Sequence, residues 1–280
     1  MSMKKEGKPM SKQVGKNAAR VDAYDKVTGR AKYTDDLCDR GALVVKVCRS
    51  TIAHGLVKAI DTSEAEAVPG VVKVLTCFDV PDIEFPTAGH PWSTDPAHQD
   101  VADRKLLNRH VRYYGDDVAA VIAEDEVAAA QAIRAIRVEY EELPFVLDAQ
   151  EAMREGAPQI QEGYKNNILA HSGVRQGDYE TARREPGLIK VEGWYDTPTV
   201  QHCHIENHGC FAYQEAGRVV VVTSTQIPHI VRRVVAQALG LPWGKVRIIK
   251  PYIGGGFGNK QDACMSPCAP GAPPRWGAGW

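Results

Sequence analysis

Four of the five residues at positions 254–258 are glycine, and this run constrains the fold more than any other stretch of the chain. It follows a strand-like segment, residues 246–250, and a single turn residue, Pro251. Consecutive glycines let the backbone bend sharply or come very close to another group. They also leave successive N–H groups uncovered, and such groups form a concavity that suits oxyanions and oxo ligands. The run by itself therefore predicts either a hinge or a binding loop.

Two common phosphate-binding motifs do not fit the run. Lys260 is followed by Gln261, whereas a Walker P-loop has Ser or Thr after its lysine. The pattern Gly-x-Gly-x-x-Gly with an acidic residue downstream, typical of dinucleotide-binding folds, is also absent from this part of the sequence.

Four further motifs precede the glycine run in order. Residues 224–226 read Ser-Thr-Gln and follow the apolar run 219–222, and one helix signal and one strand signal separate them from the glycines. The other three are Lys-Val-Thr-Gly-Arg-Ala-Lys-Tyr at 26–33, Tyr-Tyr-Gly-Asp-Asp-Val-Ala at 113–119 and Gln-His-Cys-His-Ile-Glu-Asn-His at 201–208. Together the five motifs resemble the molybdenum-binding subunits of the xanthine dehydrogenase/aldehyde oxidase family.

Length and composition limit the other classes. A chain of 280 residues is long enough for two domains. A net charge of -1 gives no reason to expect nucleic acid or a membrane surface as a partner. No apolar run approaches the ~18 residues that span a bilayer, and the polar start is unlike a signal peptide. Seven scattered cysteines favour reduced thiols in the cytoplasm and lack the spacing of an iron–sulfur module.

We expect an α+β chain of four parts. Strands alternate with helices over residues 26–145, and the resemblance implies the a/b hammerhead domain there. Residues 1–25 are expected to form a loosely ordered arm. By resemblance, the start of a molybdopterin-binding domain occupies residues 165–262. A tail, residues 263–280, is rich in Pro and Gly and is expected to be disordered.

Several elements can be placed by their hydrophobic pattern. Apolar alternation or continuous apolar runs predict strands at 42–49, 71–76, 118–123, 138–141, 188–195, 219–222 and 246–250. The strand at 188–195 is expected to pair with the valine run 219–222. Helices are predicted at 63–67, 127–137 and 228–239, and residues 81–105 read as a long surface loop.

Gln226 and the glycine run are the candidate cofactor-binding residues. A glutamine between a strand and a helix can cap a turn or donate to a ligand. The resemblance implies that Gln226 donates to an oxo group of molybdenum and that backbone N–H groups at Gly255, Gly256, Phe257 and Gly258 hold the cofactor. It implies a molybdopterin-type cofactor, in the cytosine dinucleotide form, whose dithiolene holds the metal without protein ligands.

The histidines at 201–210 invite a zinc interpretation, with His202, His204 and His208 beside two cysteines. Their spacing follows no recognised zinc pattern. If this segment is a strand, His202, His204 and Glu206 share one face. We interpret them as residues that shape the cofactor and substrate cleft.

Gln261 is the candidate substrate residue. The resemblance implies purine hydroxylation, of hypoxanthine and xanthine toward urate, and places a purine-binding glutamate at this position. Glutamine keeps an acceptor but cannot share a proton with the substrate. An aldehyde or another N-heterocycle is therefore an alternative substrate. The resemblance also implies FAD and 2Fe-2S clusters on partner subunits.

The tail departs from the family pattern. Pro270, Pro273 and Pro274 cannot continue the helix that the family places after the glycine run. We expect a one-base frameshift after codon 263, so that no catalytic residue is identified here and the general base belongs to the missing carboxyl-terminal part. The fragment alone is then expected to bind the cofactor weakly or not at all and to lack turnover. Its alternatives are a non-catalytic fragment that docks on the FAD or iron–sulfur subunit, and a misfolded remnant.

Overall fold

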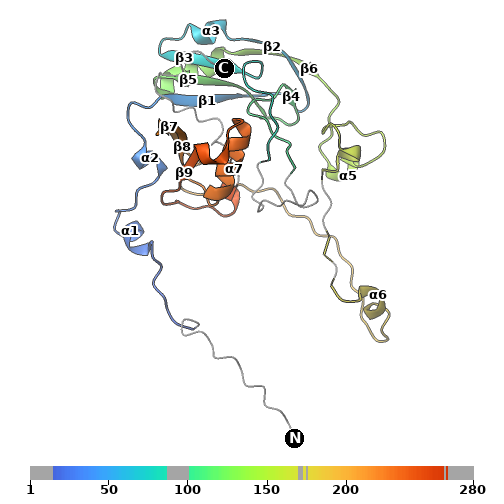
Figure 1. The fold of residues 1–280 in the computed structure, drawn as a ribbon. Coiled ribbons are helices and arrows are strands. Elements are labelled where there is room, and N and C mark those ends of the chain that lie inside the picture. The colour runs from blue at the N-terminus through green and yellow to red at the C-terminus, as the bar shows by residue number, and fades with distance from the viewer. Residues whose placement is uncertain (1–14, 87–100, 170–172, 175, 262, 264–280) are drawn as a thin grey trace.

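The computed structural model describes residues 15–86, 101–169, 173–174, 176–261 and 263 of the chain. Within these residues the strands form three three-stranded sheets, which belong to two packed bodies (Figure 1). The first 14 residues of the predicted arm, the middle of the predicted surface loop (87–100) and the tail after residue 263 lie outside the described residues.

The first body, at the top of Figure 1, contains two antiparallel sheets with the strand orders β1-β5-β3 and β4-β2-β6. Its strands are β1 (Val44–Arg49), β2 (Gly55–Asp61), β3 (Val71–Thr76), β4 (His110–Val111), β5 (Asp117–Ala123) and β6 (Arg137–Glu142). Strand β5 lies at the centre of its sheet, and residues 118–123 are all buried. The continuous apolar run therefore predicted a buried strand correctly.

Helix α4 (Glu126–Ala135) covers the sheet that contains β1 and β5. Asp125 is the N-cap residue of α4. Its carboxylate accepts hydrogen bonds from the backbone N–H groups of Val127 and Ala128, the second and third residues of the helix. The buried face consists of alanines, which let the helix approach the sheet closely. The predicted helix start is confirmed. The shorter helices are α1 (Ala23–Val27), α2 (Thr34–Leu37), α3 (Ser63–Glu66), α5 (Ala149–Ala152) and α6 (Tyr179–Ala182).

The second body combines a hairpin with a parallel crossover. Strands β7 (Cys210–Glu215) and β8 (Arg218–Thr223) are antiparallel, and β8 continues through α7 (Pro228–Ala238) into the parallel strand β9 (Val246–Ile249). Pro228 occupies the first turn of α7, where its missing N–H costs nothing. Gly240, with φ +62°, follows the helix end. The helix predicted at 228–239 and the strand predicted at 246–250 are confirmed.

The core of the second body is formed by valines of β8 and α7. Val221 packs against Val231, Val234 and Val235, all essentially inaccessible to solvent. Phe85, from the loop between β3 and β4, is buried in the same core. The described ends of that loop also pair with each other through a bridge between residues 85 and 104. This loop therefore connects the two bodies.

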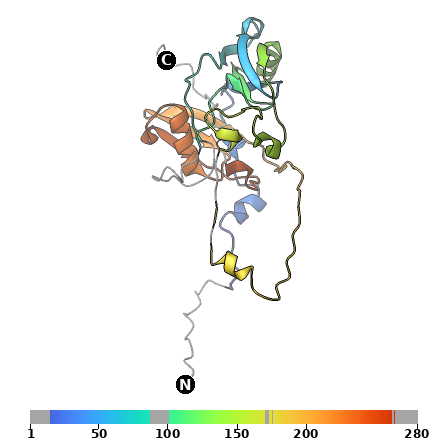
Figure 2. The ribbon, with the colours of Figure 1, turned by 90° about the vertical axis from the view of Figure 1, so that its right-hand side faces the viewer.

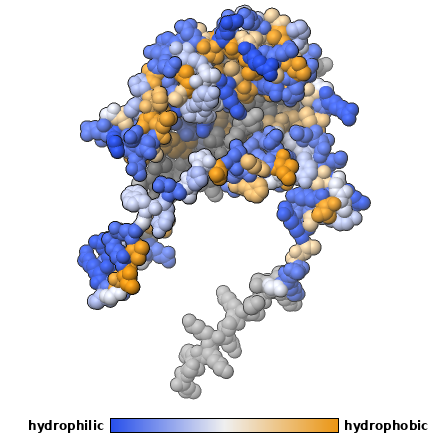
Figure 3. Space-filling model, turned by 180° about the vertical axis from the view of Figure 1, so that it is seen from behind, coloured by the Kyte–Doolittle hydropathy of each residue, from blue (hydrophilic) through white to orange (hydrophobic). Residues whose placement is uncertain are grey.

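The strand predicted at 188–195 is not formed, and this prediction is wrong. The segment has no regular structure, and its apolar side chains are exposed, Ile189 to 90% and Trp194 to 93%. The valine run pairs instead with β7 and β9, so both of its edges are occupied. Residues 176–200, which include α6, extend away from the body (Figure 2), and apolar side chains lie uncovered on the protruding lobe (Figure 3).

Strands β2, β4 and β7 were missed by the sequence interpretation. The alternation in β2 is weak because Gly55 and Lys58 interrupt it, and β4 is two residues long. The end of α1 and the four-residue helix α2, within residues 26–37, are also not among the predicted helices. In the described part of the chain, none of the helices has both the length and the apolar character needed to cross a membrane.

Candidate functional site

The glycine run forms a loop that begins after β9 and ends at Lys260. Three residues of the loop have positive φ angles: Gly255 (+103°), Phe257 (+48°) and Gly258 (+87°). Glycine adopts such angles without cost, whereas Phe257 occupies the left-handed region that few side chains favour. The loop therefore has a strained residue between its glycines. Strain of this kind is concentrated at functional sites.

Each of the first three glycines lies against one polar residue. A Cβ atom at Gly254 would lie 2.5 Å from Cβ of Glu206, one at Gly255 would lie 3.0 Å from Cβ of His204, and one at Gly256 would lie 2.5 Å from Cδ of Gln226. Any side chain at these positions would require a neighbour to move. The glycine triplet is therefore needed for close packing against the 204–206 segment and Gln226, in addition to its turn geometry.

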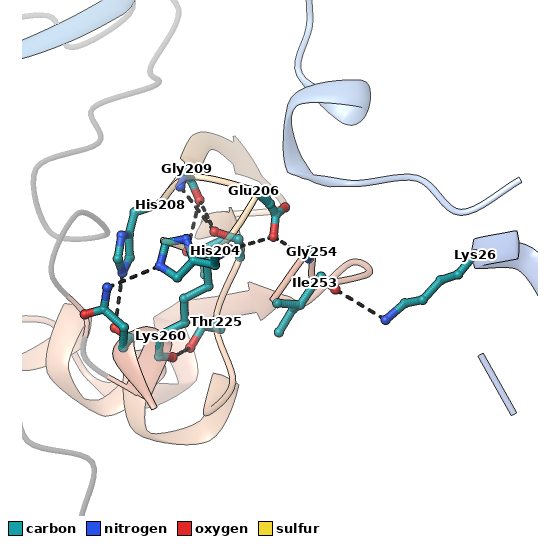
Figure 4. Close-up of polar contacts among 12 residues, drawn as sticks. Lys26, His204, Glu206, His208, Gly209, Thr225, Ile253, Gly254 and Lys260 are labelled. Carbon is teal, nitrogen blue, oxygen red and sulfur yellow. Dashed lines mark hydrogen bonds and ion pairs between the residues drawn. The ribbon is translucent and has the colours of Figure 1, made fainter. Parts of the chain in front are cut away.

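Glu206 joins the two ends of the loop. Its Oε2 accepts from the backbone N–H of Gly254 at 2.8 Å and from Nζ of Lys260 at 2.7 Å (Figure 4). The Lys260 side chain is fully buried, and that of Glu206 is 15% exposed. A buried lysine is stable in its charged form only with such a partner. The ion pair therefore fixes residues 254 and 260 at one carboxylate.

Two histidines hold the last turn of the loop. Nε2 of His208 lies 3.1 Å from the carbonyl oxygen of Asn259, and Nε2 of His204 lies 3.2 Å from the side-chain nitrogen of the same residue (Figure 4). The two imidazole rings meet edge to face, with centroids 5.0 Å apart. The backbone of Gln226 donates to the carbonyl of Lys260 at 2.9 Å, which attaches the start of α7 to the same turn.

Residues 202–206 do not form the strand that would place His202, His204 and Glu206 on one face, and Cys203 has a positive φ of +50°. His202 is exposed, so it does not share the packed position of His204 and Glu206. Within the described residues, no group of three or more His, Cys, Asp or Glu side chains is arranged to hold a metal ion. His204 and His208 contact the loop, and the interpretation that this segment shapes the cofactor and substrate cleft stays a prediction.

The loop borders a cavity of about 790 Å³. Gln226, Gly255 and Gly256 line it, together with Lys250 and Tyr252 from the segment that leads into the loop. The amino-terminal arm completes the wall with Arg20, Asp22 and Lys26. A cavity of this size accommodates a cofactor-sized ligand.

The amino-terminal arm is fixed to the loop by polar contacts. Nζ of Lys26 donates to the carbonyl of Ile253 at 3.3 Å and pairs with Asp22 at 3.1 Å (Figure 4). The hydroxyl of Tyr252 donates to Asp25 at 2.5 Å, and this hydrogen bond raises the pKa of the Tyr252 phenol. The sequence interpretation missed these contributions. The only signal was the presence of the 26–33 motif in the resemblance.

The structure brings together some of the predicted site residues and separates others. Gln226, Gly255 and Gly256 share one cavity wall. Phe257 is 72% exposed, and Gly258 is also exposed. Gln261 is exposed in a short turn after the loop and is outside the cavity lining.

The residues present fit a phosphate-bearing organic cofactor. The Oε1 atom of Gln226 is buried and has no hydrogen-bond partner in the described part of the chain. A buried polar atom of this kind normally has a partner, and rotation of the amide would present a donor in its place. Cationic side chains on the same cavity wall, from Arg20, Lys26 and Lys250, suit the negative charge of phosphate.

Comparisons with known proteins cover most of the chain. Residues 28–144 match the family model described as "Aldehyde oxidase and xanthine dehydrogenase, a/b hammerhead domain". Residues 160–272 match the model described as "Molybdopterin cofactor-binding domain". The first match coincides with the first body, and the second contains Gln226 and the glycine loop.

Individual relatives agree with these matches. The chain is 48% identical over 251 residues to the xanthine dehydrogenase molybdenum-binding subunit of Escherichia coli O157:H7, covering 89% of this chain and 33% of that protein. It is 35% identical over 250 residues to the nicotinate dehydrogenase large molybdopterin subunit of Eubacterium barkeri, covering 89% and 56%. The structure of aldehyde oxidoreductase from Desulfovibrio gigas superposes with a TM-score of 0.76 at 29% identity, covering 89% and 28%.

Proposed function

This chain belongs to the xanthine dehydrogenase/aldehyde oxidase family of molybdenum hydroxylases, and we propose that it provides the cofactor-binding loop of a purine hydroxylase. The support for this proposal is the match of residues 28–144 to the a/b hammerhead domain and of residues 160–272 to the molybdopterin cofactor-binding domain. The chain spans about a third of the length of its Escherichia coli relative. The activity of the whole protein is therefore part of the proposal. The same holds for the division of the chain into a hammerhead domain at 26–145 and a molybdopterin-binding domain that begins at 165 and extends to 262.

One observation carries the proposal: the contact between Gln226 and Gly256 in the wall of the cavity. The amide lies so close to the loop that a Cβ at Gly256 would be 2.5 Å from its Cδ, and its oxygen is buried without a partner. The cofactor would supply the oxygen-transfer chemistry. The chain itself would orient the cofactor through Gln226 and through backbone N–H groups at Gly255, Gly256, Phe257 and Gly258.

Hypoxanthine or xanthine is the proposed substrate, hydroxylated toward urate in purine catabolism. Its support is the 48% identity to a xanthine dehydrogenase subunit. We further propose the cytosine dinucleotide form of the cofactor, a cytoplasmic location, and FAD and 2Fe-2S clusters on partner subunits. The relative's printed name, a subunit, supports an assembly of several chains.

An aldehyde or N-heterocycle such as nicotinate is the second candidate substrate class. The observation that favours it is Gln261, where the resemblance places a purine-binding glutamate. An amide cannot exchange a proton with a purine nitrogen as a carboxylate can. The similarity to a nicotinate dehydrogenase subunit also fits this candidate.

Cofactor retention tests the proposal directly. A full-length protein that contains this chain is produced in a bacterial host that makes the cytosine dinucleotide cofactor, and bound molybdenum and pterin are measured per chain. We expect retention to be lost in Gly256→Val, whose side chain would collide with Gln226, and kept in Gly244→Ala, where the added Cβ meets no atom within 4 Å. Equal retention in both variants, or none in the parent chain, would refute the assignment of the loop.

Substrate class is tested in the assembled enzyme. A full-length protein that contains this chain is combined with candidate FAD and iron–sulfur subunits, and dye reduction is compared for xanthine, nicotinate and benzaldehyde. Faster reduction with xanthine supports the purine assignment. Faster reduction with either of the other substrates rejects it in favour of the second candidate.

A further inference from the structure

A second hollow, of about 400 Å³, lies beside the first turn of α7 and along β9. Four of the residues that line it are cationic: Arg218, Arg232, Arg247 and Lys250. His229 and Trp243 also line it, and no acidic side chain from the described part of the chain does. The chain as a whole carries a net charge of -1, so this excess of positive charge is local.

Most of these cations lack a counter-charge. Within the described residues, Arg218, Arg232 and Lys250 form no ion pair, whereas Arg247 pairs with Glu215 at 2.9 Å. Both members of that pair are about half exposed, so the pair is weak and water can replace it. Cations gathered without partners repel each other, and an anion in the hollow would relieve that repulsion.

Arg232 provides an independent indication of a ligand. Its Nε is buried and has no hydrogen-bond partner in the described part of the chain. Leaving a buried donor of a charged group unpaired is costly, and native structures usually satisfy it with protein, water or a bound ion. Arg232 also lines the hollow, so an anion bound there could be held by its guanidinium.

The start of α7 adds to the positive field. The helix has 11 residues, no side-chain cap and no acidic residue in its first turn. Its first two residues, Pro228 and His229, line the hollow. The unneutralised amino-terminal end of a helix carries partial positive charge and attracts anions.

We propose that this hollow binds a phosphate-type anion with more than one negative charge, such as a phosphate ester or a diphosphate. Several arginines around one hollow can each present a fork of N–H groups to different phosphate oxygens. The volume exceeds that needed for a single ion and leaves room beside Trp243 for an organic group. The inference is independent of the proposed function, because the hollow shares only Lys250 with the glycine-loop cavity.

Titration calorimetry with sodium pyrophosphate on the full 280-residue chain, at constant ionic strength, tests this inference. We expect saturable binding of one pyrophosphate per chain, weakened roughly tenfold or more by Arg232→Gln, because a charge-assisted hydrogen bond is lost. Arg218→Gln, at the exposed start of β8, should weaken binding as well, and it keeps the test available if Arg232→Gln does not fold. Arg184→Gln removes one exposed charge beside α6, outside the hollow, and should change affinity less than roughly twofold.

Three results would overturn the inference. The first is no saturable heat at about 10 mM pyrophosphate, which exceeds the millimolar dissociation constants of weak specific sites. The second is equal weakening by Arg184→Gln and Arg218→Gln, which would indicate diffuse attraction to the whole surface. The third is tighter binding of citrate than of pyrophosphate, which would assign the hollow to carboxylates instead.

Discussion

Replacement of Lys260 by methionine should destabilise the protein substantially, because it leaves a carboxylate without its cation. In the native structure the side chain of Lys260 is fully buried, and its Nζ lies 2.7 Å from Oε2 of Glu206. Two unit charges at this separation attract by about 6 kcal/mol at an effective dielectric constant of about 20. Desolvation offsets most of this attraction in the intact pair, but removal of one partner costs about 3–5 kcal/mol.

The contacts of Glu206 set the expected value within that range. Its Oε2 keeps the hydrogen bond from the N–H of Gly254 at 2.8 Å. Its Oε1 is buried and has no hydrogen-bond partner in the described part of the chain. The hydrogen bond stabilises the orphaned charge, and the burial of Oε1 destabilises it. We therefore expect Lys260→Met to lower the free energy of unfolding by about 4 kcal/mol, the middle of the range for buried pairs.

Urea unfolding followed by circular dichroism measures this effect. The matched control is Lys73→Met, an exposed position on β3, which should change the free energy of unfolding by less than about 0.5 kcal/mol. The double variant Lys260→Met/Glu206→Gln removes both charges and should recover at least about 1 kcal/mol relative to Lys260→Met. The reasoning fails if Lys260→Met is as stable as the control, or if the double variant recovers nothing.

Three further predictions concern stability and use the same unfolding assay. Gly256→Ala places a Cβ 2.5 Å from Cδ of Gln226 and should cost about 1–3 kcal/mol, whereas Gly244→Ala, in open space, should cost less. Asp125→Ala removes an acceptor for two backbone N–H groups at the start of α4 and should cost about 1 kcal/mol. Burial lowers the pKa of His110 below its ordinary 6.5, so the unfolded state binds the proton first and stability should fall as the pH drops below 6.5. His110→Gln should make that decline shallower.

Most regular elements could be predicted from the sequence because their signals are local. The run at 118–123, the Asp125 cap and Pro228 at the start of α7 each determine their own neighbourhood, and the structure has each where the pattern indicates. The segment 188–195 was also predicted to be a strand from its apolar alternation, but it has no regular structure. A strand requires a partner edge, and both edges of the valine strand are occupied by β7 and β9. Alternation predicts the capacity to pair and not the pairing itself.

The site was predictable only in part, because some of its contacts join residues that are far apart in the sequence. The glycine run stands out by its residue types, and the resemblance to the family added Gln226; the structure places Gln226, Gly255 and Gly256 in one cavity wall. The arm was expected to be loose, yet Asp25 accepts a hydrogen bond from Tyr252, a contact between residues 227 positions apart. No local pattern encodes contacts at that separation, because they depend on how the two bodies pack.

The glycine triplet shows what sequence reasoning about such loops leaves out. Glycines were expected for backbone flexibility and for exposed N–H groups. In the structure, however, Gly254 and Gly256 do not have positive φ angles, so the turn alone would tolerate other residues there. What excludes a side chain is the neighbour across the loop, Glu206 in one case and Gln226 in the other. The loop is therefore held in one shape by its contacts, and a preformed loop binds a ligand without the entropy cost of ordering it.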